Sequence, residues 1–330
     1  MHSIQRRKSR VNIFAATIAF ALAAPLAVHA GLSGGKLFYL DLSGQVMRSN
    51  TDGSDATPIV TGVSGTGPDG IAVDTTGGHV YWSTMGKVSE NDGTIMRADL
   101  DGKNVTTIVP AGGAFTPKQI KLDPQNKKIY WSDREGMRVM RSNFDGSKIE
   151  TLVVTGEGDV ERKDQSRWCV GIAIDVAGGK VYWTQKGADN ANQGTIKRAS
   201  LELPAGANPA NRKDIEVLFS NLPEPIDLEL DLKARHIYWT DRGDNTVSRA
   251  PMDGKKAGFD PGKRTDREVL VTGMHEAIGI ALDERNKQLY YTSLRGEVGT
   301  AKFNGKEARM LKTDHGRLTG IAFAEVKDRK

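Results

Sequence analysis

The stretch YWTD at 238–241 belongs to a set of six similar segments spread along the chain. The copies are FYLD at 38–41, YWST at 81–84, YWSD at 130–133, YWTQ at 182–185, YWTD at 238–241 and YYTS at 290–293. All seven tyrosines and four of the five tryptophans lie within them. Scattered core aromatics would not be spaced in this way, so the segments indicate an internal repeat of 43 to 56 residues.

Three other short segments recur around each aromatic segment. An apolar segment that ends in Asp precedes five of the aromatic segments, and this Asp lies seven residues before the first aromatic residue. These segments are GIAVD at 70–74, QIKLD at 119–123, GIAID at 171–175, DLELD at 227–231 and GIALD at 279–283. After the aromatic segment come a third segment, such as VMRSN at 139–143, which usually leads into Asp-Gly or Asn-Gly, and a fourth, such as ETLVV at 150–154. Short segments separated by turn residues predict four antiparallel strands per repeat, which is one blade of a β-propeller.

The ends of the repeat region predict how the ring closes. The first repeat begins directly at KLFYLD (36–41) and lacks an innermost strand, whereas GIAF at 320–323 is an innermost strand with no aromatic segment after it. We expect 320–323 to join the first blade, which leaves no open edge. The predicted fold class is all-β: a six-bladed β-propeller with four antiparallel strands per blade, closed by strand 320–323.

These repeats resemble the YWTD, or class B, repeats of the low-density-lipoprotein receptor family, and the resemblance covers residues 31–330. It implies a rigid binding or spacing module rather than an enzyme. The chain differs from those receptors because it has no neighbouring cysteine-rich modules and no second apolar span after residue 30. Receptor endocytosis is therefore not implied, and we expect a free-standing, exported form of the propeller.

Residues 1–30 have the features of a secretory signal peptide. Basic residues at 6, 7, 8 and 10 precede an apolar run at 11–26, and the segment ends on the small-x-small pattern VHA at 28–30. A membrane anchor is an alternative, but the run is short for one; adjacent arginines also allow a twin-arginine route. We expect 31–330 to be a single monomeric propeller, periplasmic or secreted, without a membrane span.

Removing residues 1–30 changes the charge balance. The full chain has 46 Lys and Arg against 41 Asp and Glu, and four of the basic residues lie in 1–30, which leaves 42 against 41. This nearly neutral balance gives no indication of nucleic-acid binding, which requires a clustered basic surface. The single cysteine, Cys169, cannot form an intramolecular disulfide, and about 300 residues bury a sufficient core without one.

Propeller ligands commonly lie at the central axis, so the residue that precedes each innermost segment is a candidate for contact. These residues are Asp69, Lys118, Val170, Ile226, Ile278 and Thr319. A propeller hydrolase or lactonase with an axial calcium needs a cage of Glu, Asn and Asp there, whereas this ring has one acid and one cation. We expect no metal and no cofactor, and we keep the hydrolase as the alternative to a binding module or structural scaffold.

Trp168 is the one tryptophan outside the aromatic segments. Its position ahead of the fourth blade indicates a stacking platform or an interface anchor, or alternatively a plug over the channel. The loops 84–94, 155–169 and 185–195 are unusually long, and extended loops are commonly functional. We expect them to rise on one face around blades two to four, with Lys118 between them.

Two dipeptides in the loops of blades six and one, His275-Glu276 and Asp314-His315, should become neighbours when the ring closes. Together they could bind a divalent metal or perform acid–base chemistry. Loop residues of these types also serve solubility alone.

Two opposite charges, Lys121 and Glu229, replace the alanine of other innermost segments. We expect them to face each other or water in the channel. A recurring Arg of the third segment, such as Arg141, could pair with the Asp of the aromatic segment, such as Asp133, on the neighbouring strand.

A competing surface lies on the opposite face, where the hairpins 202–214 and 254–266 carry Arg212, Lys213, Lys255, Lys256, Lys263 and Arg264. These hairpins are interpreted as solvated protrusions, although an acidic partner or a membrane surface could use them. We favour the axial face because it adds an aromatic anchor. The predicted ligand is a protein, peptide or glycan.

Overall fold

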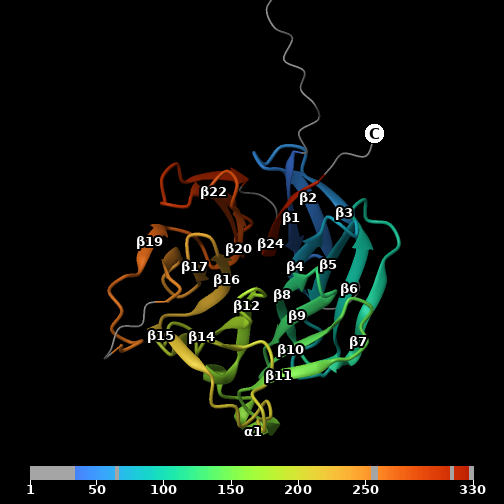
Figure 1. Ribbon diagram of the computed structural model, residues 1–330. Helices are drawn as coiled ribbons and strands as arrows, with labels where there is room; N and C mark the ends of the chain where they lie inside the picture. The colour runs from blue at the N-terminus through green and yellow to red at the C-terminus, as the bar shows by residue number, and fades with distance from the viewer. Residues whose placement is uncertain (1–33, 64–66, 254–258, 313–315, 327–330) are drawn as a thin grey trace, which may run out of the picture. The chain divides into compact units, whose positions relative to one another are not determined.

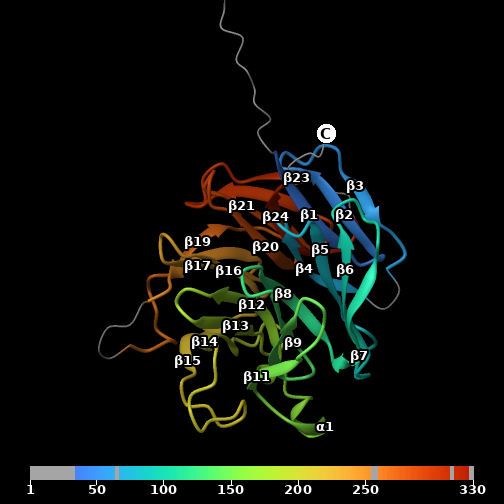
Figure 2. The ribbon, with the colours of Figure 1, turned by 45° about the vertical axis from the view of Figure 1, so that its right-hand side comes forward.

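The structure, a computed structural model, describes residues 34–63, 67–253, 259–312 and 316–326. Within the unit Ser33–Lys330, these residues form six four-stranded antiparallel sheets around a central axis (Figure 1, Figure 2). The predicted six-bladed propeller is thereby confirmed. Residues 1–30, the expected signal segment, lie outside the described residues.

Each blade has the same order of strands from the axis outward. The innermost strands are β24 (Leu318–Glu325), β4 (Pro68–Asp74), β8 (Pro117–Asp123), β12 (Cys169–Asp175), β16 (Pro225–Asp231) and β20 (Ala277–Asp283). The second strands, which carry the aromatic segments, are β1 (Gly35–Asp41), β5 (His79–Thr84), β9 (Lys128–Asp133), β13 (Lys180–Gln185), β17 (His236–Asp241) and β21 (Gln288–Ser293).

The outer half of each blade is built from the third and fourth recurring segments. The third strands are β2 (Gln45–Asn50), β6 (Gly93–Asp99), β10 (Arg138–Asn143), β14 (Gly194–Ser200), β18 (Thr246–Pro251) and β22 (Val298–Lys302). The outermost strands are β3 (Thr57–Val60), β7 (Thr106–Ala114), β11 (Glu150–Val154), β15 (Glu216–Leu222), β19 (Glu268–Val271) and β23 (Arg309–Lys312).

The ring closes as the sequence predicts. Strand β24 pairs antiparallel with β1 and places Phe323 opposite Leu37 and Ile321 opposite Tyr39. It is longer than the predicted 320–323. The helical elements are α1 (Gly158–Glu161) and a 3-10 turn at Gln165–Arg167, and none of the helices in the described ranges is long and apolar enough to cross a membrane.

Two adjacent aromatic residues on each second strand hold the blades together. Successive side chains on a strand point to opposite faces, so the first aromatic residue packs toward one neighbouring blade and the second toward the other. Tyr130 of the third blade therefore shares a core cluster with Trp183 of the fourth, and Tyr182 of the fourth with Trp239 of the fifth. All four tryptophans of the aromatic segments are 0% exposed.

The Ser or Thr that follows the aromatic pair links neighbouring innermost strands. The Thr184 hydroxyl accepts a hydrogen bond from Gly171 N–H (2.7 Å) in its own blade and donates one to Ile226 O (2.7 Å) in the next. The strands approach so closely that a Cβ on Gly171 would lie 3.0 Å from Asp227 Cα. Hydroxyls on the other second strands also bond to the next blade's innermost strand, from Ser83, Ser132, Thr240 and Thr292.

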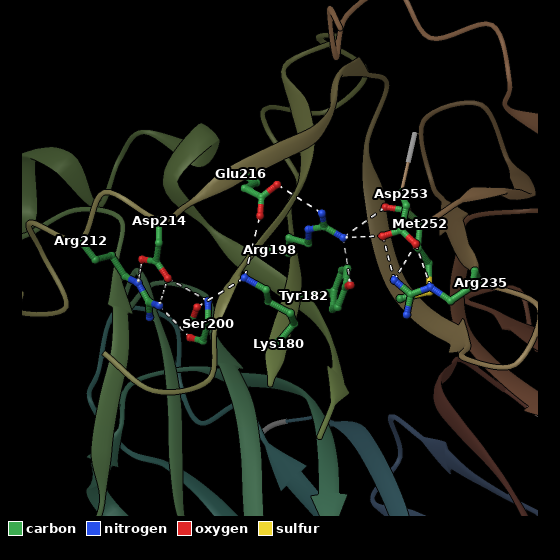
Figure 3. A network of polar contacts seen from close by, with 10 residues as sticks. All are labelled: Lys180, Tyr182, Arg198, Ser200, Arg212, Asp214, Glu216, Arg235, Met252 and Asp253. Carbon is green, nitrogen blue, oxygen red and sulfur yellow. Dashed lines mark hydrogen bonds and ion pairs between the residues drawn. The ribbon is translucent and has the colours of Figure 1, made fainter. Parts of the chain in front are cut away.

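The recurring Arg forms a second link between blades. Arg198 donates to Met252 O (3.4 Å) and to Asp253 (3.1 Å) in the next blade, and to Glu216 (3.2 Å) in its own (Figure 3). Arg141 and Arg249 reach the equivalent carbonyls, those of Leu201 and Phe303.

This Arg does not pair with the Asp of the aromatic segment, a pairing that the sequence had left open. The register of the strands places Arg141 opposite Tyr130, whereas Asp133 lies at the other end of its strand. There the Asp133 carboxylate accepts Thr116 N–H (2.6 Å) and binds Arg138 (2.5 Å). In the fifth blade Asp241 likewise accepts Glu224 N–H (2.9 Å). The Asp thus fixes the loop that leads into the innermost strand.

Replacing Thr184 by Val should destabilise the fold by about 1–3 kcal/mol, because it leaves a buried N–H and a buried carbonyl without their shared partner. Urea unfolding measures this loss. Thr57→Val, at an exposed position on β3, is the control and should change the unfolding free energy little. Equal effects of the two substitutions would contradict the linking role of the hydroxyl.

Asp133 and Asp241 occupy equivalent positions but should respond oppositely to neutralisation. Asp241 is buried and its Oδ2 has no hydrogen-bond partner; burial, with a contribution from Asp244, raises its pKa from 3.8 to about 6. Between these values the folded state binds a proton that the unfolded state does not, so stability falls as the pH rises through this window. Above pH 6, Asp241→Asn should therefore be more stable than wild type, by up to about 3 kcal/mol.

Urea unfolding between pH 4 and 8 checks this difference. Asp133→Asn is the matched control, and because it removes an ion pair with Arg138 it should lower stability above pH 4. If Asp241→Asn were less stable than wild type at pH 8, the account of Asp241 would be incorrect.

Candidate functional site

A pocket of about 340 Å³ lies at the axis, on the face where the chain enters the innermost strands. Six buried residues, one from each innermost strand, form what we call the floor ring. They are the residues identified from the sequence: Asp69, Lys118, Val170, Ile226, Ile278 and Thr319. A second set of six, the rim ring, directly follows the aromatic segments: Leu42, Met85, Arg134, Lys186, Arg242 and Leu294.

The floor ring has an apolar side and a charged side. Val170, Ile226 and Ile278 form one apolar cluster. On the other side the buried Lys118 ammonium contacts the Asp69 carboxylate, which also accepts a hydrogen bond from Gln119 Nε2 (3.1 Å). Burial lowers the pKa of Lys118, and the carboxylate only partly offsets this. The floor thus offers apolar contact beside a neutralised ion pair.

The rim ring was not identified from the sequence, although each member occupies the same place after its aromatic segment. Its three cations lie on consecutive blades, the third to the fifth, and its three apolar residues on the sixth, first and second. The rim ring therefore forms a polar wall opposite an apolar wall, and Arg317 adds a cation beside Leu42 on the apolar side. A comparison of this single position across the six repeats would have revealed the division.

Carboxylates behind the polar wall hold its cations in place. Arg134 binds Glu135 (2.6 Å), and Lys186 and Arg242 share the buried Glu224 at 2.8 and 2.6 Å. Burial alone would raise the pKa of Glu135, but the Arg134 guanidinium outweighs it and the pKa is lowered. These pairs neutralise the wall and leave directed N–H donors at the pocket.

Trp168 lies in the wall of this pocket beside the rim cations. Its indole N–H donates to Arg162 O (2.8 Å). The Arg134 guanidinium carbon lies 5.1 Å from the ring centroid and the Lys186 ammonium 5.7 Å from it. Both cations thus lie within the range in which cation–π attraction holds the ring.

The three long loops meet at the same pocket. Loop 84–94 contributes Met85, loop 185–195 contributes Lys186 and Asp189, and loop 155–169 contributes Gln165 and Trp168. The three loops thus lie on the predicted face, although all six blades contribute to the lining of the pocket.

The structure describes only one of the two histidine dipeptides, His275-Glu276. His275 Nδ1 lies 2.7 Å from Glu297 Oε1, and Glu276 N–H donates to Asn245 Oδ1 (2.7 Å). Asp314 and His315 lie outside the described residues. Within the described ranges, no group of three or more His, Cys, Asp and Glu side chains is placed to hold a metal ion.

Lys121 and Glu229 lie on the innermost strands of the third and fifth blades, with Lys121 Nζ 2.6 Å from Glu229 Oε1. Burial acts to lower the pKa of Lys121, but Glu229 and the nearby Asp227 outweigh it and raise the pKa. Burial also raises the pKa of Asp227 to about 7, with Lys121 opposing the shift. The pair joins non-adjacent blades through the channel.

The hairpins of the opposite face are not simply solvated, and that interpretation is wrong for their arginines. The side chain of Arg212 is buried and donates to Leu152 O (2.8 Å) and Ser200 O (2.7 Å) while it binds Asp214 (Figure 3). Arg264 stacks on Phe219, with 3.9 Å from guanidinium carbon to ring centroid. Lys213 and Lys263 are exposed, and Lys255 and Lys256 lie outside the described residues.

The comparisons with known proteins agree with the repeats and the ring. The chain is 43% identical over 292 residues to "Low-density lipoprotein receptor-related protein 1" of Pyricularia oryzae, covering 85% of this chain and 92% of that protein. The chain belongs to the YWTD β-propeller family of low-density lipoprotein receptor-related proteins. No protein-family model matches it.

Two further matches to this YWTD propeller are one of sequence and one of fold. "3-Hydroxyacyl-CoA dehydrogenase-like protein LAM1" of Cochliobolus heterostrophus is 39% identical over 266 residues, which is 78% of this chain and only 56% of that protein. The solved structure titled "Crystal structure of Nidogen/Laminin Complex" matches with a TM-score of 0.68 at 23% identity, over 88% of this chain and 98% of the other. That likeness shows the fold.

Lys118→Met should lower the unfolding free energy by about 3–5 kcal/mol, because it leaves the Asp69 charge buried without its partner. The double variant with Asp69→Asn removes both charges and should recover most of the loss. Thermal and urea unfolding of the two variants checks this. A double variant no more stable than the single one would contradict the coupling of the pair.

Proposed function

We propose that the protein is an exported, non-catalytic binding module that recognises a protein, peptide or glycan on the face at which the axial pocket opens. The observation that carries the proposal is the convergence of three long loops and Trp168 on that one pocket. Export rests on the sequence features of residues 1–30.

The chemistry of the pocket suits a ligand of mixed character. Its apolar wall and Trp168 can pack against a side chain or a sugar ring, while the donors of the polar wall fix orientation. Binding energy at interfaces is concentrated in a few such aromatic and Arg anchors. Beyond the pocket, Val88 in loop 84–94 and Val160 in α1 are 79% and 85% exposed, which extends the apolar contact area for a protein partner.

Two of the three named proteins support a binding role, whereas the third, the dehydrogenase-like protein, matches this chain over only 56% of its own length. One is named as a receptor-related protein, and the nidogen structure is that of a complex with laminin. The hydrolase alternative gains no support from the floor ring, because its one carboxylate, Asp69, is bound to Lys118. A scaffold role would use the same face, with the ligand as its attachment point.

The test uses the full chain to capture its ligand from the extracellular or periplasmic fraction and then measures affinity with the purified component. Trp168→Ala should weaken binding by about 2 kcal/mol or more, which is roughly thirtyfold. Trp168→Phe keeps an aromatic ring but loses the bond to Arg162 O, and should weaken binding less.

The matched control is Lys213→Ala combined with Lys263→Ala on the opposite face, which should bind like wild type. Melting temperatures establish that each variant is folded. The proposed face would be wrong if the opposite-face control lost binding while Trp168→Ala kept it.

A further inference from the structure

A second pocket, of about 350 Å³, lies between the third and fourth blades. Its polar lining includes Thr155, Asp164, Arg167, Gln185 and Lys197, and Trp183 forms part of its apolar wall. The loop that leads into the fourth blade separates it from the axial pocket: Gln165 and Trp168 line the axial pocket, whereas Asp164, Ser166 and Arg167 line this one.

Lys197 carries a charge that nothing nearby in the described part of the chain balances. Its ammonium donates to Gln185 Oε1 (2.7 Å), a neutral amide, and no described carboxylate lies within ion-pair distance of it. The acidic group that acts on the pKa of Lys197 is the Cys169 thiol, and burial raises the pKa of this thiol to about 12, so it is uncharged at neutral pH. Arg167, in contrast, binds Glu161 at 3.0 Å and Asp164 at 3.4 Å.

The other blades show that the fold does not require a lysine here. Lys197 lies opposite Trp183, and the residues at the same position in the other blades are Met47, Met96, Met140, Ser248 and Gly299. In the fifth blade Arg267 reaches this place and hydrogen-bonds Ser248 (3.0 Å), but it is balanced by Asp244 (2.6 Å). The fourth blade alone keeps a cation here without a described counter-ion.

Lys197 is half-buried, and even partial burial of an ammonium without a counter-ion is unfavourable, because the ammonium loses part of its solvating water. Burial accordingly lowers the pKa of Lys197. An anion that enters the pocket would restore the balance and gain a charge-assisted hydrogen bond. The volume exceeds what a single inorganic ion fills, and the lining, which is mostly polar, leaves room for further hydrogen-bonding groups of a larger molecule.

We propose that the pocket between the third and fourth blades binds a small organic anion, whose carboxylate or phosphate oxygen accepts a hydrogen bond from Lys197 Nζ while its body lies among the other lining residues, such as Thr155 and Ser166. This site is distinct from the axial pocket and does not depend on the function proposed for it. Bound anion would also contact the loop whose other side carries Trp168.

Calorimetry and thermal shift with acetate, benzoate and inorganic phosphate, at constant ionic strength against chloride, test the proposal. At least one of these anions should bind and raise the melting temperature. Tighter binding of benzoate than of acetate indicates that the natural ligand is a carboxylate with an apolar body. Tighter binding of phosphate than of either carboxylate indicates a phosphate ester. Lys197→Met should weaken the response at least about tenfold. It should also melt above wild type in the anion-free buffer, because it removes the unbalanced charge.

Three control variants keep the result interpretable. Lys180→Met removes a lysine of the same blade that lies 3.9 Å from Glu216, and it should keep the anion response, as should Lys197→Arg and Trp168→Ala. The proposal is overturned if none of the three anions binds, or if Lys197→Met responds as wild type does. Should Lys197→Met fail to fold, Lys197→Gln takes its place in the same comparison.

Discussion

The alternation of side chains along a β-strand is the constraint on which the rest of this propeller depends. It sends two adjacent aromatic residues of each second strand into two different blade interfaces, so that Tyr182 packs with Trp239 of one neighbour and Trp183 with Tyr130 of the other. No blade can bury its own aromatic pair alone. The hydroxyl of the next residue then fixes the distance between innermost strands, as Thr184 does, and closure by β24 extends the same contacts around the whole ring.

A ring held in this way leaves two positions per blade free to vary at the axis. The backbone of each innermost strand is fixed by hydrogen bonds, so the floor and rim side chains project into the pocket whatever their chemistry. Asymmetry can therefore be built there without a change in the backbone, provided that buried charges are paired: three successive blades supply Arg134, Lys186 and Arg242, and the other three supply apolar residues. Sites placed on rigid elements in this manner hold their geometry well.

The sequence predicts the parts of the molecule that repeat and misses those that depend on contacts between blades. Repeats predict blade number, strand order, closure and the floor ring, because each is a property of one repeat applied six times. The buried Glu224 beneath two rim cations could not be predicted, since it joins residues 186, 224 and 242 through spacing that only the folded ring sets. Arg212 was misjudged for the same reason: its partners include the carbonyl of Leu152 on another blade.

Because the chain repeats six times, each charged residue can be compared with the residues at the same position in the other blades. At the axis, Lys118 and Lys121 depart from the small or apolar residues of other blades, and each departure is answered by a carboxylate, Asp69 or Glu229. The unpaired Asp241 can relieve its cost by taking up a proton, because burial has already raised its pKa. Lys197 has no described carboxylate partner, because the group that it contacts is a neutral amide. It also does not become neutral easily, because a lysine has a high intrinsic pKa. A cation retained where three other blades carry Met is thus the departure that the fold itself explains least, and an external anion is the simplest partner that completes it.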